Sequence, residues 1–272
     1  MQLKQPEIAP FKKFPNAIII GARKGGTRAL LDALALHPNI KIAKHEIHFF
    51  DDNATYENGF NWYKEQMPYS NLNDIVIEKT PGYFTSKFAP KRIYQFDKTI
   101  KLIIILRNPI QRIISDFTQV YFTRQQANKS LPIFEKEAFL PGTDVINTMY
   151  KPIRNSLYIL HIKNYLEYFD AKQILFINGD NFVKKPLEEL QKVEQFLSLR
   201  HLITDTQLVF DQTKGFFCFK MNFNQKAKCL GSAKGRTHIP FNFKTIKKLK
   251  RNLNYYNKEL MKVVNITNLY YE

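Results

Sequence analysis

Short apolar runs separated by amphipathic stretches make up most of this chain. Asn16–Gly21 contains four consecutive apolar residues and Lys101–Leu106 is similarly apolar, which predicts strands buried on both faces. Ile75–Glu78 and Gln173–Ile177 predict two further strands. None of these runs approaches the roughly 20 residues that cross a bilayer, so we expect no membrane span in this chain.

Helical spacing of apolar residues follows the strands. The spacing predicts helices over Arg28–His37, 108–122, Pro152–Phe169, Pro186–Leu199 and Lys244–Val263. Alternating strands and helices predict an α/β fold in which helices flank both faces of a parallel sheet. We expect one domain over residues 1–272, with 1–14 as an N-terminal extension and Ser130–Met149 as a long loop.

The pattern changes after Gln212. Phe216–Phe219 and Lys226–Leu230 could pair as a hairpin, which Cys218 and Cys229 could staple across eleven residues. Two thiols without paired histidines make a poor zinc site, so we expect a disulfide, which implies an oxidising compartment.

Targeting signals leave the cellular route open. The polar segment 1–14 has no signal-peptide core, so either the protein is cytosolic or its targeting segment is absent from this chain. The sequons at Asn53, Asn128 and Asn265 are compatible with a glycoprotein of the secretory route, although chance matches are common.

Charge narrows the class of partner. The chain has 41 Lys and Arg against 24 Asp and Glu, a net charge of +17. Gln212–Lys258 contains 12 basic residues and no acidic one. A solvated basic face is one interpretation. The other is a polyanion partner: nucleic acid, an acidic membrane or a sulfated polysaccharide.

A basic, glycine-containing loop follows the first strand: Lys24-Gly25-Gly26-Thr27-Arg28. Backbone amides at a helix N-terminus, with glycines that allow close approach, form a phosphate site, although an ordinary basic turn fits as well. The loop departs from the P-loop pattern of nucleoside triphosphatases, because Thr27 stands where the lysine belongs and Arg28 where the metal-binding hydroxyl belongs. We therefore expect a P-loop-like phosphate site that needs no metal.

Two further stretches carry acidic and basic side chains. Glu46 and His48 would lie on the same side of an extended backbone, with Asp51 close by, so Glu46 is a candidate general base. Taken alone, a surface acid and a core histidine are the favoured interpretation. Lys79, at the carboxyl end of a strand within Glu78-Lys79-Thr80-Pro81-Gly82-Tyr83, could meet a phosphate or sulfate, or simply belong to a turn.

Two more stretches offer phosphate ligands. Arg107 ends a strand, and Ser115 follows about two helical turns later, so both could reach one phosphate. A structural ion pair and a helix-face hydroxyl are the alternatives. Lys234-Gly235-Arg236-Thr237-His238 supplies donors within the acid-free region, or is only a flexible basic loop.

In this order, the motifs resemble the heparan sulfate glucosamine 3-O-sulfotransferase family, which belongs to the PAPS-dependent sulfotransferases. The resemblance covers about Phe14–Pro240 and, more loosely, the C-terminus. The matching stretches are Lys24–Arg28, Glu46-Ile47-His48-Phe49-Phe50, Glu78-Lys79-Thr80-Pro81, Arg107 with Ser115, Thr213-Lys214-Gly215-Phe216 leading into Cys218, and Lys234–His238.

The resemblance implies transfer of a sulfuryl group from PAPS to the 3-hydroxyl of glucosamine in heparan sulfate, in the Golgi lumen or elsewhere in the secretory pathway. Lys24–Arg28 would cradle the 5′-phosphosulfate, Arg107 and Ser115 the 3′-phosphate, and Lys234–His238 would close over the donor. Glu46 would be the base in an in-line transfer, with Lys24, Lys79 and His48 as further catalytic groups. The implied sugar-site residues are Arg23, Glu46, His48, Asp51, Lys79 and Gln119, and the implied disulfide is Cys218–Cys229.

Three positions depart from the family pattern. Asn108 stands where the family usually has Asp, Gly82 replaces a small residue with a side chain, and Ile239 precedes Pro240. None of the three removes a proposed catalytic group.

Other classes of function remain in competition. A P-loop kinase is disfavoured by the displaced lysine, and a nucleic-acid-binding protein by the lack of zinc-finger spacing or an RRM-type motif. A heparin-binding protein without catalysis is disfavoured by the presence of Glu46, Lys24 and Lys79.

Overall fold

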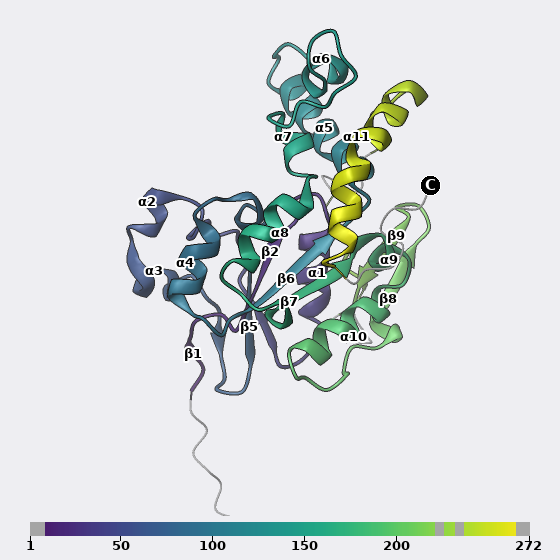
Figure 1. Cartoon of the computed structure of the whole chain (residues 1–272). Helices are drawn as coiled ribbons and strands as arrows, with labels where there is room; N and C mark the ends of the chain where they lie inside the picture. Colours follow the sequence, from purple (N-terminus) through teal and green to yellow (C-terminus); the bar gives the residue numbers. More distant parts are fainter. Residues whose placement is uncertain (1–8, 221–225, 232–236, 265–272) are drawn as a thin grey trace, which may run out of the picture.

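A computed structural model describes residues 9–220, 226–231 and 237–264 (Figure 1). Within these ranges, a parallel sheet of five strands has the order β3-β5-β2-β6-β7. The strands are β2 (Ala17–Gly21), β3 (Ile40–Ile42), β5 (Ile75–Lys79), β6 (Lys101–Leu106) and β7 (Ile174–Asn178). The four predicted strands are confirmed. β3 was not predicted, because three residues are too few to show a pattern.

Helices cover both faces of the sheet, as predicted. Side chains alternate across a strand, so Ile18 and Ile20 of β2 face one core while Ile19 faces the other. The first core includes Ile93 of α4 (Ala89–Phe96) and Tyr158 of α8 (Tyr158–Leu166). The second core takes residues of α1 (Thr27–Leu34) and α10 (Pro186–Phe196). The uninterrupted apolar runs are therefore strands buried on both faces.

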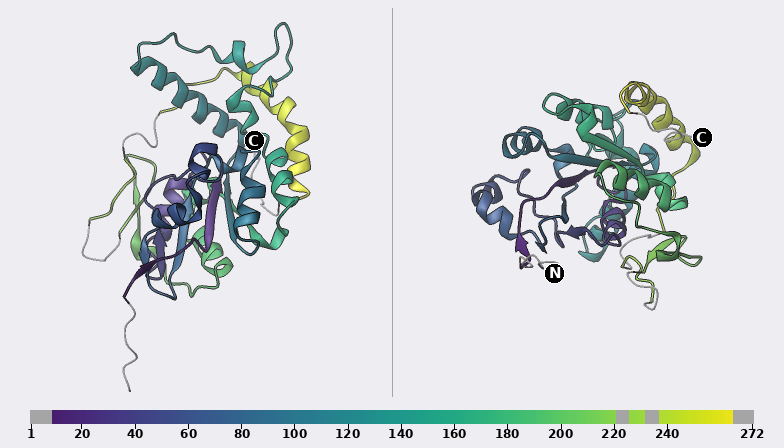
Figure 2. Two further views of the ribbon diagram at one scale, coloured as in Figure 1. Left: turned by 90° about the vertical axis from the view of Figure 1, so that its left-hand side faces the viewer. Right: turned by 90° about the horizontal axis from the view of Figure 1, so that it is seen from below.

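Part of the helical region projects beyond the sheet as an arm (Figures 1 and 2). Its elements are α5 (Pro109–Gln126), α6 (Phe134–Ala138), α7 (Lys151–Arg154) and α11 (Phe243–Met261). A third apolar cluster joins them, with Phe117, Phe134 and Leu249 among its members. α5 runs four residues past its predicted end, and the predicted loop over Ser130–Met149 contains the short helix α6.

The helix predicted over Pro152–Phe169 is two helices, α7 and α8, separated by three residues. Arg112, from the distant helix α5, accounts for the break. Arg112 donates to the carbonyl of Pro152, which a continuous helix would offer to the amide of Ser156. The Ser156 amide donates to Ile153 instead, and the Ser156 hydroxyl accepts from Arg112.

The C-terminal cysteines form the expected disulfide, Cys218–Cys229. The hairpin prediction needs a correction of detail. β9 (Phe216–Phe219) pairs antiparallel with β8 (Leu208–Asp211), a strand that was not predicted. Its pairing with the segment after 226 is a single bridge, between Phe219 and Lys228. The bridge lies next to the Cys218–Cys229 disulfide. The disulfide and this single bridge therefore connect residues 226–231 to β9, in place of the longer strand pairing that was predicted.

Small elements complete the described chain. β1 (Phe11–Lys12) pairs with β4 (Tyr69–Ser70), so the end of the expected N-terminal extension belongs to a two-stranded ladder. None of the described helices is long and apolar enough to cross a membrane. The remaining elements are α2 (Asn53–Tyr56), α3 (Gly59–Glu65), α9 (Gly179–Lys184) and the 3-10 turns Tyr83–Thr85, Ala171–Gln173 and Asp205–Gln207.

A buried ion pair joins the arm to the sheet. Arg112 of α5 is 0% exposed and donates to Asp116 at 2.8 Å and to the carbonyl of Arg23 at 3.3 Å. Asp116 also accepts from the guanidinium of Arg23 at 3.1 Å. Burial opposes ionisation of the Asp116 carboxyl, but the charges and hydrogen bonds of the two arginines outweigh burial and lower its pKa.

We predict that Asp116→Asn lowers the free energy of unfolding by about 3 kcal/mol, because it leaves Arg112 buried without its counter-charge. A lowered carboxyl pKa stabilises the fold above the ordinary pKa, and this stabilisation is lost as the pH falls through the lowered value. The difference between variant and wild type should therefore be largest near neutral pH and shrink in acid. Urea unfolding at several pH values measures it.

Asp144→Asn is the matched control, because Asp144 pairs with Arg251 at 3.1 Å on the surface of the arm. Exposed pairs contribute little, so this variant should unfold almost as the wild type does. Equal losses in the two variants would contradict the importance of the buried pair.

Candidate active site

A cleft of about 1000 Å³ opens where the strands of the parallel sheet end. Carboxyl ends of parallel strands are where open α/β sheets bind ligands. The predicted site residues that line the cleft are Arg23, Lys24, Gly25, Gly26, Thr27, Arg28, Glu46, His48, Asp51, Arg107, Ser115, Gln119 and His238. The sheet thus brings together segments that lie up to two hundred residues apart in the chain.

Five predicted residues are not among those that line the cleft, for different reasons. Lys79 is 4% exposed and lies behind Glu46. Thr237 is exposed and immediately precedes the cleft residue His238. Lys234, Gly235 and Arg236 lie outside the described residues.

The loop after β2 is shaped for close approach of a ligand to the backbone. A Cβ atom on Gly25 would lie 2.5 Å from the carbonyl oxygen of Ile105 in β6, so the chain passes β6 too closely for any side chain. Gly26 precedes α1 with a φ of 110°, a conformation that favours glycine. Arg28 lines the cleft, but its guanidinium also binds Asp32 at 2.9 Å and the carbonyl of Lys44 at 3.0 Å. The loop therefore offers amides, while Arg28 braces the segment before Glu46.

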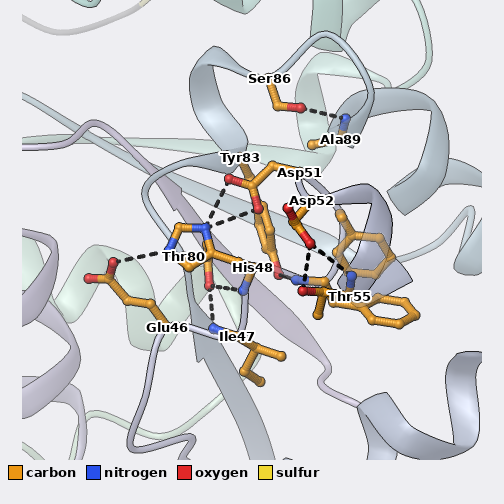
Figure 3. A network of polar contacts seen from close by, with 12 residues as sticks. Glu46, Ile47, His48, Asp51, Asp52, Thr55, Thr80, Tyr83, Ser86 and Ala89 are labelled. Atoms are coloured by element: carbon orange, nitrogen blue, oxygen red, sulfur yellow. Dashed lines mark hydrogen bonds and ion pairs between the residues drawn. The ribbon is translucent and has the colours of Figure 1, made fainter. Parts of the chain in front are cut away.

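Glu46, His48 and Asp51 form a chain of contacts along the cleft wall (Figure 3). The Glu46 carboxylate binds the Lys79 ammonium on one side and lies 3.7 Å from the His48 imidazole on the other. The far nitrogen of His48 lies 3.0 Å from Asp51. The side chains of Glu46 and His48 are 44% and 47% exposed, so His48 is not a core histidine.

The segment that carries Glu46 and His48 is not the extended strand assumed from the sequence. It has no regular hydrogen-bonding ladder, and His48 has a φ of 55°. The two side chains nevertheless lie in contact, although the extended backbone assumed for them is absent. Gly82 explains part of the geometry, because a Cβ atom there would lie 2.3 Å from the Asp51 carboxylate and 3.1 Å from the His48 ring. This departure from the family pattern leaves room for the His48–Asp51 contact.

Arg107 directly follows β6, and Ser115 lies on α5. Both are therefore on the β6 side of the Lys24–Arg28 loop, which we call the phosphate-type loop, whereas β5 lies on its other side. Arg107 forms an ion pair with Asp180 at 3.0 Å, so it is both a structural partner and a cleft cation. Asn108, the second departure, caps α5 by accepting from the amides of Ile110 and Gln111, a role that Asn and Asp fill equally well.

Cations dominate the cleft. Among the described residues that line it, eight are Lys or Arg and two are acids, Glu46 and Asp51. Burial lowers the pKa of His238, and the charges of Arg107 and Lys24, which line the same cleft, lower it further. Sequence reasoning missed Lys87, Lys151, Arg154 and Lys214 as lining cations. Lys151 and Arg154 are the first and last residues of α7.

Metal ligation has one geometric candidate in the described part of the chain. Asp211 approaches the sulfurs of Cys218 and Cys229 closely enough for a shared ion. Since the two sulfurs are bonded to each other, they are not available as thiolate ligands. This cluster is a bracing contact of the β8–β9 hairpin.

The chain is similar in sequence to known sulfotransferases, whose reaction needs an anion-binding cleft. The family described as sulfotransferase domain matches residues 14–262. The chain is 43% identical over 258 residues to the Mus musculus protein named heparan sulfate glucosamine 3-O-sulfotransferase 5, which covers 94% of this chain and 74% of the relative.

Two solved structures share the fold. A sulfotransferase from Alicyclobacillus acidocaldarius superposes with a TM-score of 0.64 at 18% identity, covering 92% of this chain and 94% of that one. Mouse sulfotransferase SULT7A1 complexed with PAP gives 0.51 at 17% identity, covering 92% and 90%. Domain, sequence and fold agree, and the chain belongs to the heparan sulfate glucosamine 3-O-sulfotransferase family.

Proposed function

We propose that this enzyme transfers the sulfuryl group of PAPS to the 3-hydroxyl of a glucosamine residue in heparan sulfate, with Glu46 as general base. The observation that carries the proposal is the carboxylate of Glu46 beside a glycine-containing loop in one cation-rich cleft. Membership of the family supports the reaction. The relatives' names supply the acceptor, and the mouse neighbour complexed with PAP supports the donor.

The residues of the donor side fit a nucleotide that carries two phosphate-type groups. Gly25 and Gly26 open the backbone to one group, and Lys24 adds charge there. Arg107 and Ser115 supply a guanidinium and a hydroxyl for the second group, on the far side of the loop. Lys234–His238 would close over the donor, and of this segment His238 reaches the cleft.

PAPS would supply an electrophilic sulfur with a phosphate leaving group. The carboxylate of Glu46 would take the proton of the attacking hydroxyl, which then approaches the sulfur opposite the leaving oxygen. Lys24 would stabilise the charge that develops on the transferred and leaving oxygens. His48, held by Asp51, would line the sugar site together with Arg23 and Gln119.

Lys79 has a different immediate partner from the one expected. Its ammonium binds Glu46 and not open cleft, so we assign it to holding the carboxylate in place. Because Lys79 is 4% exposed and its ammonium binds the base, it would reach sulfuryl oxygens only after releasing Glu46.

The disulfide supports a proposal for the cellular location. A disulfide persists in an oxidising compartment, so the Cys218–Cys229 bond supports the Golgi lumen or another part of the secretory pathway.

The direct test is transfer of labelled sulfate from PAPS to heparan sulfate, with the disaccharides of the product mapped. We expect label on the 3-hydroxyl of glucosamine. Transfer to another glycan only would overturn the acceptor assignment, and tight PAP binding with no transfer to any acceptor would indicate a binding protein. Turnover of ATP in place of PAPS would favour the kinase alternative.

We predict that Glu46→Gln reduces kcat by about 10²–10⁴-fold, because the amide cannot accept the proton. Binding of PAP should stay near the wild-type value, since Glu46 contacts Lys79 and His48 rather than the donor loop. Steady-state kinetics and calorimetric titration with PAP measure the two effects. Glu167→Gln, the same change on an exposed residue outside the cleft, should have no effect on either. Turnover within a few-fold of wild type in Glu46→Gln would remove the assignment of the base.

We predict that affinity for heparan sulfate falls steeply between about 50 and 200 mM salt, because binding a polyanion to clustered cations releases counterions. Lys151→Ala combined with Arg154→Ala should reduce the slope of log affinity against log salt, since both residues line the cleft. Titrations over a salt series measure the slope. An affinity that does not change with salt would contradict electrostatic recognition of the polysaccharide.

A further inference from the structure

The cleft segment with Glu46 and His48 lacks the backbone hydrogen bonds that a helix or a strand would provide. Residues 47 and 48 belong to neither helix nor strand and Phe49 lies in a turn, so the amides of residues 47–49 find no ladder partner. Unpaired amides in a half-buried segment are costly and leave the chain free to move. The positions of both side chains therefore depend on what accepts these amides.

Two side-chain hydroxyls accept them. The Thr80 hydroxyl accepts from the amide of Ile47 at 3.0 Å and lies 3.5 Å from the amide of His48 (Figure 3). The Tyr83 hydroxyl accepts from the amide of Phe49 at 3.0 Å. Three consecutive amides are thus tied to the turn that follows β5.

The hydroxyls are themselves held from behind. Thr80 donates its proton to Glu78, a carboxyl with 0% exposure that also accepts from the Tyr63 hydroxyl at 3.3 Å. With its proton committed to Glu78, the Thr80 oxygen turns its lone pairs toward the Ile47 amide. The carbonyl of Tyr83 accepts from the hydroxyl of Tyr165 at 2.8 Å, which fixes the second anchor to α8.

Burial shows that this network is rigid. Thr80, Tyr63, Tyr83 and Tyr165 are each 0% exposed, so packed neighbours restrict their rotamers. Glu78 and Thr80 flank Lys79 in sequence, and Lys79 binds Glu46 directly. The same three-residue stretch, 78–80, therefore holds Glu46 twice, by its carboxylate and by the backbone that follows it.

We propose that Thr80 and Tyr83 are positioning residues for the transfer, whose hydroxyls, with Glu78 behind Thr80, set the placement of Glu46 and His48 through the amides of residues 47–49. The inference rests on the proposed role of Glu46. None of these hydroxyls needs to touch substrate. Their effect is on the geometry of the base, for which a misplacement of about 1 Å can cost 10²-fold in rate.

The test compares Thr80→Val with Thr80→Ser. Valine keeps the shape of threonine and removes the acceptor, whereas serine keeps the hydroxyl and removes a methyl group. We expect Thr80→Val to lower kcat by about 10–100-fold, with the KM for PAPS within twofold of wild type. Thr80→Ser should restore kcat to within a few-fold. Rates are expressed per PAP-binding site, so loss of folded protein does not count as loss of catalysis.

Two outcomes overturn the inference: Thr80→Val with wild-type kcat, or Thr80→Ser as slow as Thr80→Val. Should Thr80→Val fail to bind PAP because it does not fold, Tyr83→Phe decides, since it removes only the oxygen that accepts from Phe49. A lower kcat at unchanged PAP binding supports the proposal, and an unchanged kcat overturns it. Failure of the proposed function is separate, because wild type itself would then transfer no sulfate.

Discussion

The buried side chain of Arg112 is the contact on which most of this architecture depends. A guanidinium with 0% exposure must have every donor paired, and its partners come from four segments. It donates to Asp116 on its own helix, to the Arg23 carbonyl in the loop after β2, to the Pro152 carbonyl in α7 and to Ser156 between α7 and α8. One side chain therefore fixes the arm relative to the phosphate-type loop and breaks the helix that supplies two cleft cations.

The order of the sheet supplies the other constraint. β5, β2 and β6 are neighbours in one parallel sheet, and adjacent strands lie about 4.8 Å apart. The residues that follow these strands must therefore meet at one edge: the turn at Thr80, the loop at Gly25 and the cation Arg107. The amide of Thr80 donates to the carbonyl of Ile19 at 3.2 Å, which continues the β2–β5 register into the site. Base and donor loop thus share a rigid frame.

The buried polar groups behind the site form hydrogen bonds with one another. This network makes the site rigid, but it places the carboxyl group of Glu78 in the interior. Glu78 is fully buried, and burial raises its pKa to about 7 in spite of the hydrogen bonds from Thr80 and Tyr63. Such a group is retained where it orders neighbours. The residues that line the cleft include eight Lys or Arg against two acids, a balance that suits a polyanionic ligand.

The sequence by itself determined four of the five strands of the parallel sheet, the loop after the first strand, the disulfide and the family, because each is a local pattern or an ordered set of motifs. Only the tertiary structure decided the break between α7 and α8, the pairing of β8 with β9, the contact of Lys79 with Glu46, and the hydroxyl anchors of residues 47–49. All four depend on contacts between segments that are distant in the chain or lie in irregular turns, such as Arg112 with Ser156. Periodicity reports which face of an element is buried. It does not report which residues of other segments pack against that face, and those residues determine the geometry of this site.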